Sequence, residues 1–132
     1  MDPQSLLGIR HVALSVQDVQ KSVAFYSNVL GMRIEWEPDE ENVYLTSGAD
    51  NLAIHKQQAP HAEEAAQTLH HLGFIIKHID DVDAWAAHVR QAGVAIVQAP
   101  KTHRDGARSF YFRDPDGILI QMIYHPPISD RS

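Results

Sequence analysis

The sequence predicts an α+β fold in which one chain of 132 residues forms two tandem β-α-β-β-β modules. A strand-like run that begins with histidine occurs twice, at His11 and, close to half a chain later, at His71. Each run is followed by an aspartate, a pattern of apolar residues with helical spacing, and a glycine. Further strand-like segments close each half. The same order of elements is therefore predicted twice along the chain.

The two histidine-led runs each have one wholly apolar face. Its members are Val12, Leu14 and Val16 in the first run and Leu72, Phe74 and Ile76 in the second. Because side chains alternate between the faces of a strand, the apolar face should pack against a helix. Each histidine then lies on the opposite face beside a small residue, Ala13 or Gly73. Small neighbours leave room there for a cavity, and they also suit close backbone packing.

The helix of each module is marked at both ends. Asp18 and Asp81 follow the first strands and are expected to cap the helix N-termini, because a carboxylate accepts hydrogen bonds from the free amides of the first turn. Gly31 and Gly93 stand where a left-handed residue ends a helix. The apolar positions between them share one helical face. They are Val19, Val23, Tyr26 and Leu30 in the first helix and Val82, Trp85, Ala86 and Val89 in the second.

Strand-like pairs complete each module, at residues 43–46 and 51–55 in the first and at 110–113 and 118–124 in the second. The second pair is joined by Asp-Pro-Asp-Gly at 114–117. Aspartate in the first position, proline in the second and glycine in the fourth favour a tight turn. The second pair is therefore predicted to form a hairpin.

These elements predict a single domain over 1–132. We place module one at about 8–57, a linker with room for a short helix at 58–69, and module two at about 70–125. The residues after His125 are expected to be peripheral.

Composition limits the function classes. With 17 acidic and 11 basic residues, the formal net charge is −6, and no stripe of Lys and Arg is present, so nucleic acid is not an expected partner. The absence of cysteine excludes thiolate nucleophiles, disulfides and thiolate metal ligands. No apolar run reaches the length of a membrane span, and no signal peptide is recognised. We therefore expect a cytoplasmic protein that does not bind membranes.

Four polar side chains occupy matching places in the two halves. His55 and Gln121 lie on the last strands, and we interpret them as equivalent positions, as His11 and His71 are on the first strands. If the faces opposite the helices line one cavity, three imidazoles and a carboxamide converge there and suit a borderline divalent metal. The alternative for each histidine is a surface or internally hydrogen-bonded role. Gln121 can equally be a hydrogen-bonded core residue.

The chain resembles the vicinal oxygen chelate superfamily, which includes glyoxalase I, bleomycin and fosfomycin resistance proteins, methylmalonyl-CoA epimerase and extradiol dioxygenases. The resemblance rests on residues 9–16, 18–32, 71–74 and 110–121 and covers about residues 8–125. It implies a glyoxalase-like fold in which the paired modules form an open, cup-shaped, eight-stranded mixed sheet around the active site. The motifs are specific for the superfamily and not for one member.

The resemblance also implies a divalent metal ion, such as Zn, Ni, Fe or Mn, on the first and last strands. Transferred by position, its ligands are His11, His55, His71 and Gln121. Family members typically carry glutamate on the last strands, where this chain has His55 and Gln121. The carboxylate that Fe(II) dioxygenases need is therefore missing from these positions. His55 is a candidate catalytic base in place of the glutamate, because imidazole accepts a proton near neutral pH.

Two functions follow, and both imply a small-molecule partner. The leading hypothesis is a metal-dependent enzyme acting on a small oxygen-bearing substrate, as a lyase, isomerase, transferase or dioxygenase. The alternative is a binding or sequestering protein of the same fold, with or without metal; an interaction domain that uses the exposed sheet is a weaker third hypothesis. His103, Arg108 and Tyr111 are candidate substrate-binding residues, against the simpler interpretation as solvated or packing side chains. We expect a homodimer.

Overall fold

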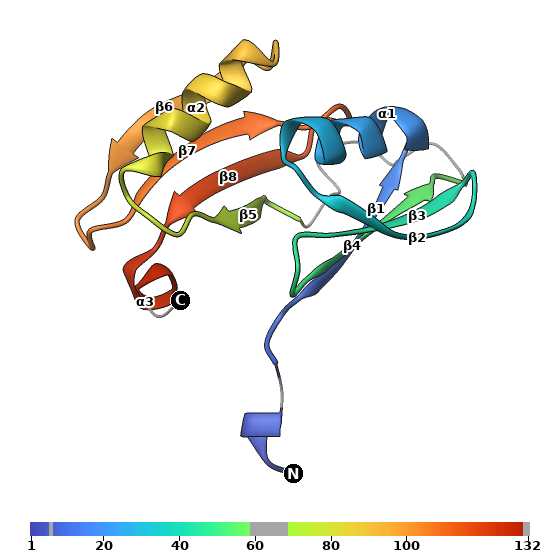
Figure 1. Ribbon diagram of the computed structural model, residues 1–132, viewed down its shortest axis with the longest axis horizontal. Helices are drawn as coiled ribbons and strands as arrows, with labels where there is room; N and C mark the ends of the chain where they lie inside the picture. The colour runs from blue at the N-terminus through green and yellow to red at the C-terminus, as the bar shows by residue number, and fades with distance from the viewer. Residues whose placement is uncertain (6, 59–68, 131–132) are drawn as a thin grey trace. The chain divides into compact units, whose positions relative to one another are not determined.

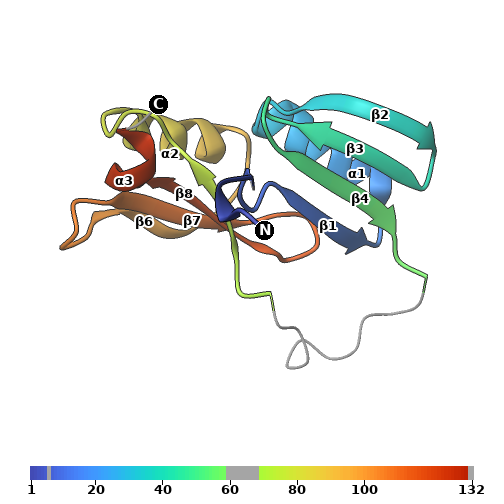
Figure 2. The same cartoon turned by 90° about the horizontal axis from the view of Figure 1, so that it is seen from below.

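The computed structural model describes residues 1–5, 7–58 and 69–130, and the chain divides into two compact units, Met1–His61 and Ala62–Ser132. Each unit contains a four-stranded mixed sheet and its own helices. The helices and strands of each unit are labelled in Figure 1 and drawn from a second side in Figure 2. The predicted α+β class and the repeated order of elements are confirmed. The helix suggested within the linker falls outside the described residues. No helix in the described ranges is long and apolar enough to cross a membrane.

Unit one begins with a short 3-10 helix, η1, and then follows the predicted order. Its elements are η1 (Pro3–Ser5), β1 (His11–Val16), α1 (Val19–Ala24), the π-helical η2 (Phe25–Val29), β2 (Arg33–Asp39), β3 (Asn42–Thr46) and β4 (Asn51–Lys56). The strands lie in the order β1-β4-β3-β2, with β1 parallel to β4 and the other pairs antiparallel. The first and last strands of the module are therefore neighbours.

The helix of unit one begins and ends at the predicted residues. The Asp18 carboxylate accepts a hydrogen bond of 3.0 Å from the backbone amide of Lys21. The helix changes from α to π geometry at Phe25, and Gly31 follows with φ of 74°. Val19, Val23 and Tyr26 are buried, and α1 packs against β3 and β4. The predicted apolar stripe thus forms the contact between helix and sheet.

Unit two repeats this arrangement. Its elements are β5 (Leu72–Ile75), α2 (Asp81–Gln91), β6 (Ile96–Thr102), β7 (Arg108–Arg113), β8 (Leu119–Tyr124) and α3 (Pro126–Ser129). The strand order β5-β8-β7-β6 matches that of unit one, again with the first and last strands parallel. The hairpin between β7 and β8 is confirmed: Gly117, with φ of 86°, donates its amide to the Asp114 carbonyl at 3.0 Å. The Asp114 side chain accepts two further amides of the turn.

Two expectations for unit two were wrong. Asp80, and not Asp81, is the N-cap residue of α2, and its side chain makes no capping hydrogen bond because the residue has helical dihedral angles. Residues 126–130, the part after His125 that the structure describes, are not peripheral, because they contain α3 and dock on their own module. The buried Ser129 hydroxyl donates to the Ile76 carbonyl at 2.8 Å.

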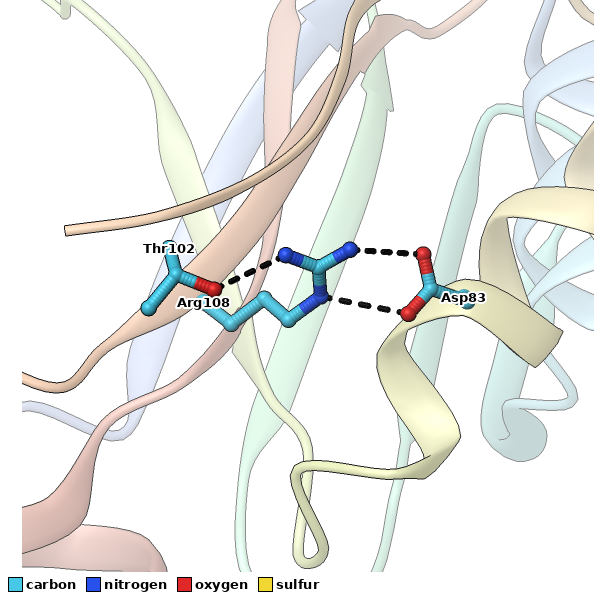
Figure 3. Close-up of polar contacts among 3 residues, drawn as sticks. All are labelled: Asp83, Thr102 and Arg108. Carbon is cyan, nitrogen blue, oxygen red and sulfur yellow. Dashed lines mark hydrogen bonds and ion pairs between the residues drawn. The ribbon is translucent and has the colours of Figure 1, made fainter.

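An ion pair joins α2 to the sheet of unit two. The Arg108 guanidinium donates through Nη2 and Nε to the two carboxylate oxygens of Asp83, at 2.8 and 3.1 Å, and through Nη1 to the Thr102 hydroxyl at 2.8 Å (Figure 3). The hydrogen bonds from Arg108 hold the pKa of the Asp83 carboxyl below its ordinary value of 3.8. The Arg108 side chain is 23% exposed and the Asp83 side chain 62%, so solvent screens the pair.

We predict that Asp18→Ala destabilises the protein by about 1 kcal/mol, because it removes the side-chain cap of α1. Asp80→Ala is the matched control, since it deletes a carboxylate from the same kind of position without breaking a capping bond. Urea unfolding of both variants measures the difference. Equal losses in the two variants would assign the effect of Asp18 to its charge and not to the hydrogen bond.

The Asp83–Arg108 pair predicts a pH dependence of stability. A carboxyl whose pKa is lowered on folding stabilises the native state above its unfolded pKa, and this contribution is lost as the pH falls through the folded pKa. Asp83→Asn should therefore lower the urea midpoint at neutral pH and lower it less in acid, below about pH 3. Asp81→Asn, on the same helical turn but outside the pair, provides the control. A deficit for Asp83→Asn that stays constant with pH would contradict the prediction.

Candidate functional site

The sheet of unit two has two chemically different faces. Phe110, Phe112, Ile120 and Met122 are buried, and α2 packs against the strands that carry them. The alternate positions carry Tyr111 on β7 and Gln121 on β8, both half-buried. Because these two residues are direct partners in the antiparallel pair, their side chains share the face opposite α2.

His71 joins Gln121 and Tyr111 on this face. Gly73 is the β5 partner of Gln121, and His71 lies two residues before Gly73, so its side chain projects on the same side. The rings of His71 and Tyr111 meet edge to face with centroids 5.8 Å apart, reaching across the strand that carries Gln121. The absence of a side chain at Gly73 leaves room beside Gln121, since the nearest atom to an added Cβ is 4.0 Å away. The structure thus brings together three of the predicted site residues.

A second histidine sets the orientation of His71. Nδ1 of His70 and Nδ1 of His71 are 2.8 Å apart. One of these nitrogens must donate and the other accept, because two lone pairs or two protons would repel. When His71 is the donor, its Nε2 carries the lone pair that a metal ion requires.

In unit one, His11 is held by a chain of two hydrogen bonds. Its Nδ1 lies 2.7 Å from the side-chain oxygen of Asn51, its direct neighbour on β4. The Asn51 amide nitrogen donates in turn to the Glu35 carboxylate at 3.0 Å. Sequence reasoning missed both Asn51 and Glu35, because only the pairing of β1 with β4 brings residue 51 to residue 11.

His55 is held in the same way at another place on the sheet. Its Nδ1 lies 2.6 Å from the side-chain oxygen of Asn42 on β3, and the Asn42 amide donates to the Asp39 carboxylate at 2.8 Å. The ring of Tyr44 packs edge to face on the His55 ring, with centroids 5.7 Å apart. Asp39 and Asn42 close the hairpin between β2 and β3, so the turn itself supplies the partners of His55.

The registers of the two sheets correct the predicted equivalence of His55 and Gln121. In unit two, Gln121 is the strand partner of Gly73. Gly73 corresponds to Ala13 in unit one, and the strand partner of Ala13 is Ala53. His55 lies two residues further along β4 and pairs with Ser15. His11 is opposite Asn51, so about 13 Å of strand separate the positions of His11 and His55. Each imidazole is also tied to its own cross-strand partner. The structure therefore does not bring His11 and His55 together as ligands of one ion.

The remaining predicted substrate-binding residues lie elsewhere in unit two. Arg108 lies on the face of β7 that carries Phe110, opposite the face that carries Tyr111. Its guanidinium donates hydrogen bonds to the Asp83 carboxylate. His103 contacts the buried Ser109 hydroxyl through Nε2, at 3.2 Å. Only Tyr111 of the three lies beside His71. A role of Arg108 or His103 in binding substrate stays a prediction.

The candidate metal-binding groups on these faces, imidazoles and an amide, carry no negative charge. Within the described part of the chain, no group of three or more His, Asp or Glu side chains is assembled as a metal site. His71 and Gln121 form a partial set of metal ligands in unit two. In unit one, the carboxylates of Glu35 and Asp39 are linked to His11 and His55 through asparagine side chains. Imidazole nitrogen and amide oxygen suit borderline dications such as Zn²⁺ or Ni²⁺ better than Mg²⁺.

Comparisons with known proteins agree with this fold. The metallothiol transferase FosB of Shouchella clausii is 33% identical over 116 residues, which cover 87% of this chain and 78% of the relative. The glutathione transferase FosA of Serratia marcescens is 32% identical over 122 residues, covering 89% and 80%. A crystal structure of lactoylglutathione lyase from Agrobacterium tumefaciens superposes with a TM-score of 0.79 at 21% identity, covering 96% of this chain and 98% of that one. At this identity the structural likeness shows the fold alone.

The family model of the glyoxalase, bleomycin resistance protein and dioxygenase proteins matches residues 8–122, which is most of the chain. The match begins just before β1 and ends within β8, so it includes both modules. The chain belongs to the Glyoxalase/Bleomycin resistance protein/Dioxygenase superfamily.

Proposed function

We propose that the protein is a metal-dependent transferase that joins a low-molecular-weight thiol to a small, oxygen-bearing electrophile. The observation that carries the proposal is the grouping of His71, Gln121 and Tyr111 on one face of the second sheet. The relatives named metallothiol transferase and glutathione transferase support the same class of reaction. Because the chain has no cysteine, the thiol must come from a second substrate.

In unit two His71 and Gln121 would hold a metal ion, and in unit one His11 is a further candidate ligand. Both histidines have Nδ1 engaged, which leaves Nε2 for coordination, and Gln121 offers its amide oxygen. Neutral ligands leave the full positive charge of the dication in place, so the bound ion would be a strong Lewis acid toward a substrate oxygen. In the transfer, a sulfur–carbon bond forms, a carbon–oxygen bond breaks, and the thiol proton ends on the released oxygen.

Tyr111 and His55 would act on the substrates. The Tyr111 hydroxyl can hydrogen-bond an oxygen substituent, and its ring keeps His71 in place. Nε2 of His55 can accept the proton of a bound thiol or hydroxyl, because Nδ1 is already used by Asn42. We therefore propose His55 as a proton acceptor and not as a ligand of the ion that His11 binds.

A second candidate function is non-catalytic binding of a small molecule. It is favoured by the absence of a carboxylate at the positions of Ala53 and Gln121, where the superfamily typically supplies glutamate. In that case the same face would bind ligand without turnover, and metal would not be required. Activity in the presence and absence of a chelator separates the two functions.

The metal proposal predicts that Gln121→Glu binds Zn²⁺ more tightly, by about tenfold or more, because a carboxylate adds negative charge to a neutral ligand set. His71→Ala should weaken binding, whereas His78→Ala, at an exposed histidine before α2, should not. Gln91→Glu is the control for Gln121→Glu, because it adds the same charge at the end of α2, away from the site. Calorimetric titration of tag-free protein with Zn²⁺ measures the affinities. If His71→Ala and Gln121→Glu bind as the wild type does, the assigned ligands are wrong.

The transferase proposal predicts a covalent adduct when the metal-loaded protein is given glutathione and a small epoxide. The adduct, detected by mass spectrometry, should form faster than in buffer, stop on addition of a chelator and return with Zn²⁺, Ni²⁺ or Mn²⁺. His71→Ala should lose the activity and His78→Ala should retain it. Tight binding of the epoxide without any adduct, unaffected by chelator, would favour the binding protein instead.

A further inference from the structure

Unit one contains the same three-part arrangement twice. Glu35, Asn51 and His11 form one chain of hydrogen bonds, with steps of 3.0 and 2.7 Å. Asp39, Asn42 and His55 form the other, with steps of 2.8 and 2.6 Å. We call them the Glu35 relay and the Asp39 relay. Each runs from a carboxylate on β2, through a cross-strand asparagine, to Nδ1 of an imidazole.

The chemistry of the three groups determines where the imidazole proton lies. An ionised carboxylate only accepts hydrogen bonds, so each asparagine must turn its NH₂ group toward Glu35 or Asp39. The asparagine oxygen then faces the histidine and can only accept. Nδ1 must therefore donate, and the neutral ring keeps its lone pair on Nε2. The carboxylate acts on the ring through the orientation of the amide and not by contact.

We propose that Glu35 and Asp39 are positioning residues that hold His11 and His55 in the Nδ1–H form, with Nε2 as the acceptor. The Glu35 relay prepares His11 to bind a metal ion, a part that rests on the proposed function. The Asp39 relay prepares His55 to accept a proton or hydrogen bond from a thiol or hydroxyl ligand. Because about 13 Å of strand separate the two histidines, the relays serve two different groups.

The surroundings of each relay fit this role. The Asp39 oxygen that receives Asn42 also accepts the backbone amide of Glu41 at 2.9 Å, so the hairpin turn orients the carboxylate. Tyr44 packs on His55 from the side and fixes the plane of its ring. His71 in unit two, the repeat equivalent of His11, has another imidazole as its Nδ1 partner, and among the described residues no carboxylate–asparagine relay reaches it. The two modules thus prepare their histidines by different means.

The test is the tautomer of each histidine, read from the nitrogen chemical shifts of the full-length, ¹⁵N-labelled protein without metal. The measurement is made at about pH 8, where free imidazole is neutral. Glu35→Gln and Asp39→Asn keep shape and remove the charge, so the carboxamide that replaces each carboxylate can donate as well as accept and no longer dictates the orientation of the asparagine. Each variant leaves the other relay intact and so serves as its control. Amide spectra and urea unfolding check that both variants are folded.

We expect Nδ1–H at His11 and His55 in the wild type. Glu35→Gln should raise the Nε2–H form of His11 alone, and Asp39→Asn that of His55 alone. An Nε2–H wild-type ring, or variants that leave both tautomers unchanged, would overturn the proposal.

A Zn²⁺ titration of the same variants separates the relay from the metal function. Glu35→Gln should weaken Zn²⁺ binding by about 10- to 100-fold, as loss of a partner behind a ligand typically does, and Asp39→Asn should not. A tautomer change at His11 without any Zn²⁺ binding to the wild type would leave the relay standing and reject the metal site. Equal weakening in both variants would overturn the separate roles of the two relays.

Discussion

The parallel pairing of the first and last strands of each module is the constraint on which the site depends. It brings His11 beside Asn51 and Gly73 beside Gln121, residues that are far apart in the chain. A parallel pair requires a long crossover, and in each module the helix and the two other strands of the sheet supply it. The apolar faces of β4 and β8 are buried, and α1 or α2 packs against these strands, which keeps each pair in register because a slip of one residue would expose that face.

The chemistry of the two modules differs although their topology is the same. The second module presents an imidazole, an amide and a phenol on one face of its sheet, with no carboxylate among them. The first module does contain carboxylates, but Glu35 and Asp39 act through asparagines on histidines. Negative charge is thereby placed behind the imidazoles, where it determines orientation, and not at the nitrogen that would meet a ligand.

Much of the architecture could be predicted because it depends on local patterns. The alternation in residues 11–16, the cap at Asp18 and the Asp-Pro-Asp-Gly turn each act within a few residues, and each is observed. The cap at Asp81 failed because the choice between adjacent aspartates depends on backbone angles that the packing of α2 sets. The guanidinium of Arg108 is chemically suited to bind an anion, but its place on the helix side of β7 gives it Asp83 as a partner.

The candidate site, like the fold, could be predicted in part from the sequence. The sequence by itself determined the family, the first strand of each module and the face on which Tyr111 and Gln121 lie, because period-two alternation assigns faces without any knowledge of the partner strand. Only the tertiary structure decided that Ala53, and not His55, matches Gln121, and that Asn51 and Asn42 stand opposite the histidines. Alternation determines the face on which a residue lies. It does not determine the residue's position along the strand relative to the neighbouring strand, because a shift by two residues keeps the same face. That position is set by strand register, which depends on the packing of the whole module.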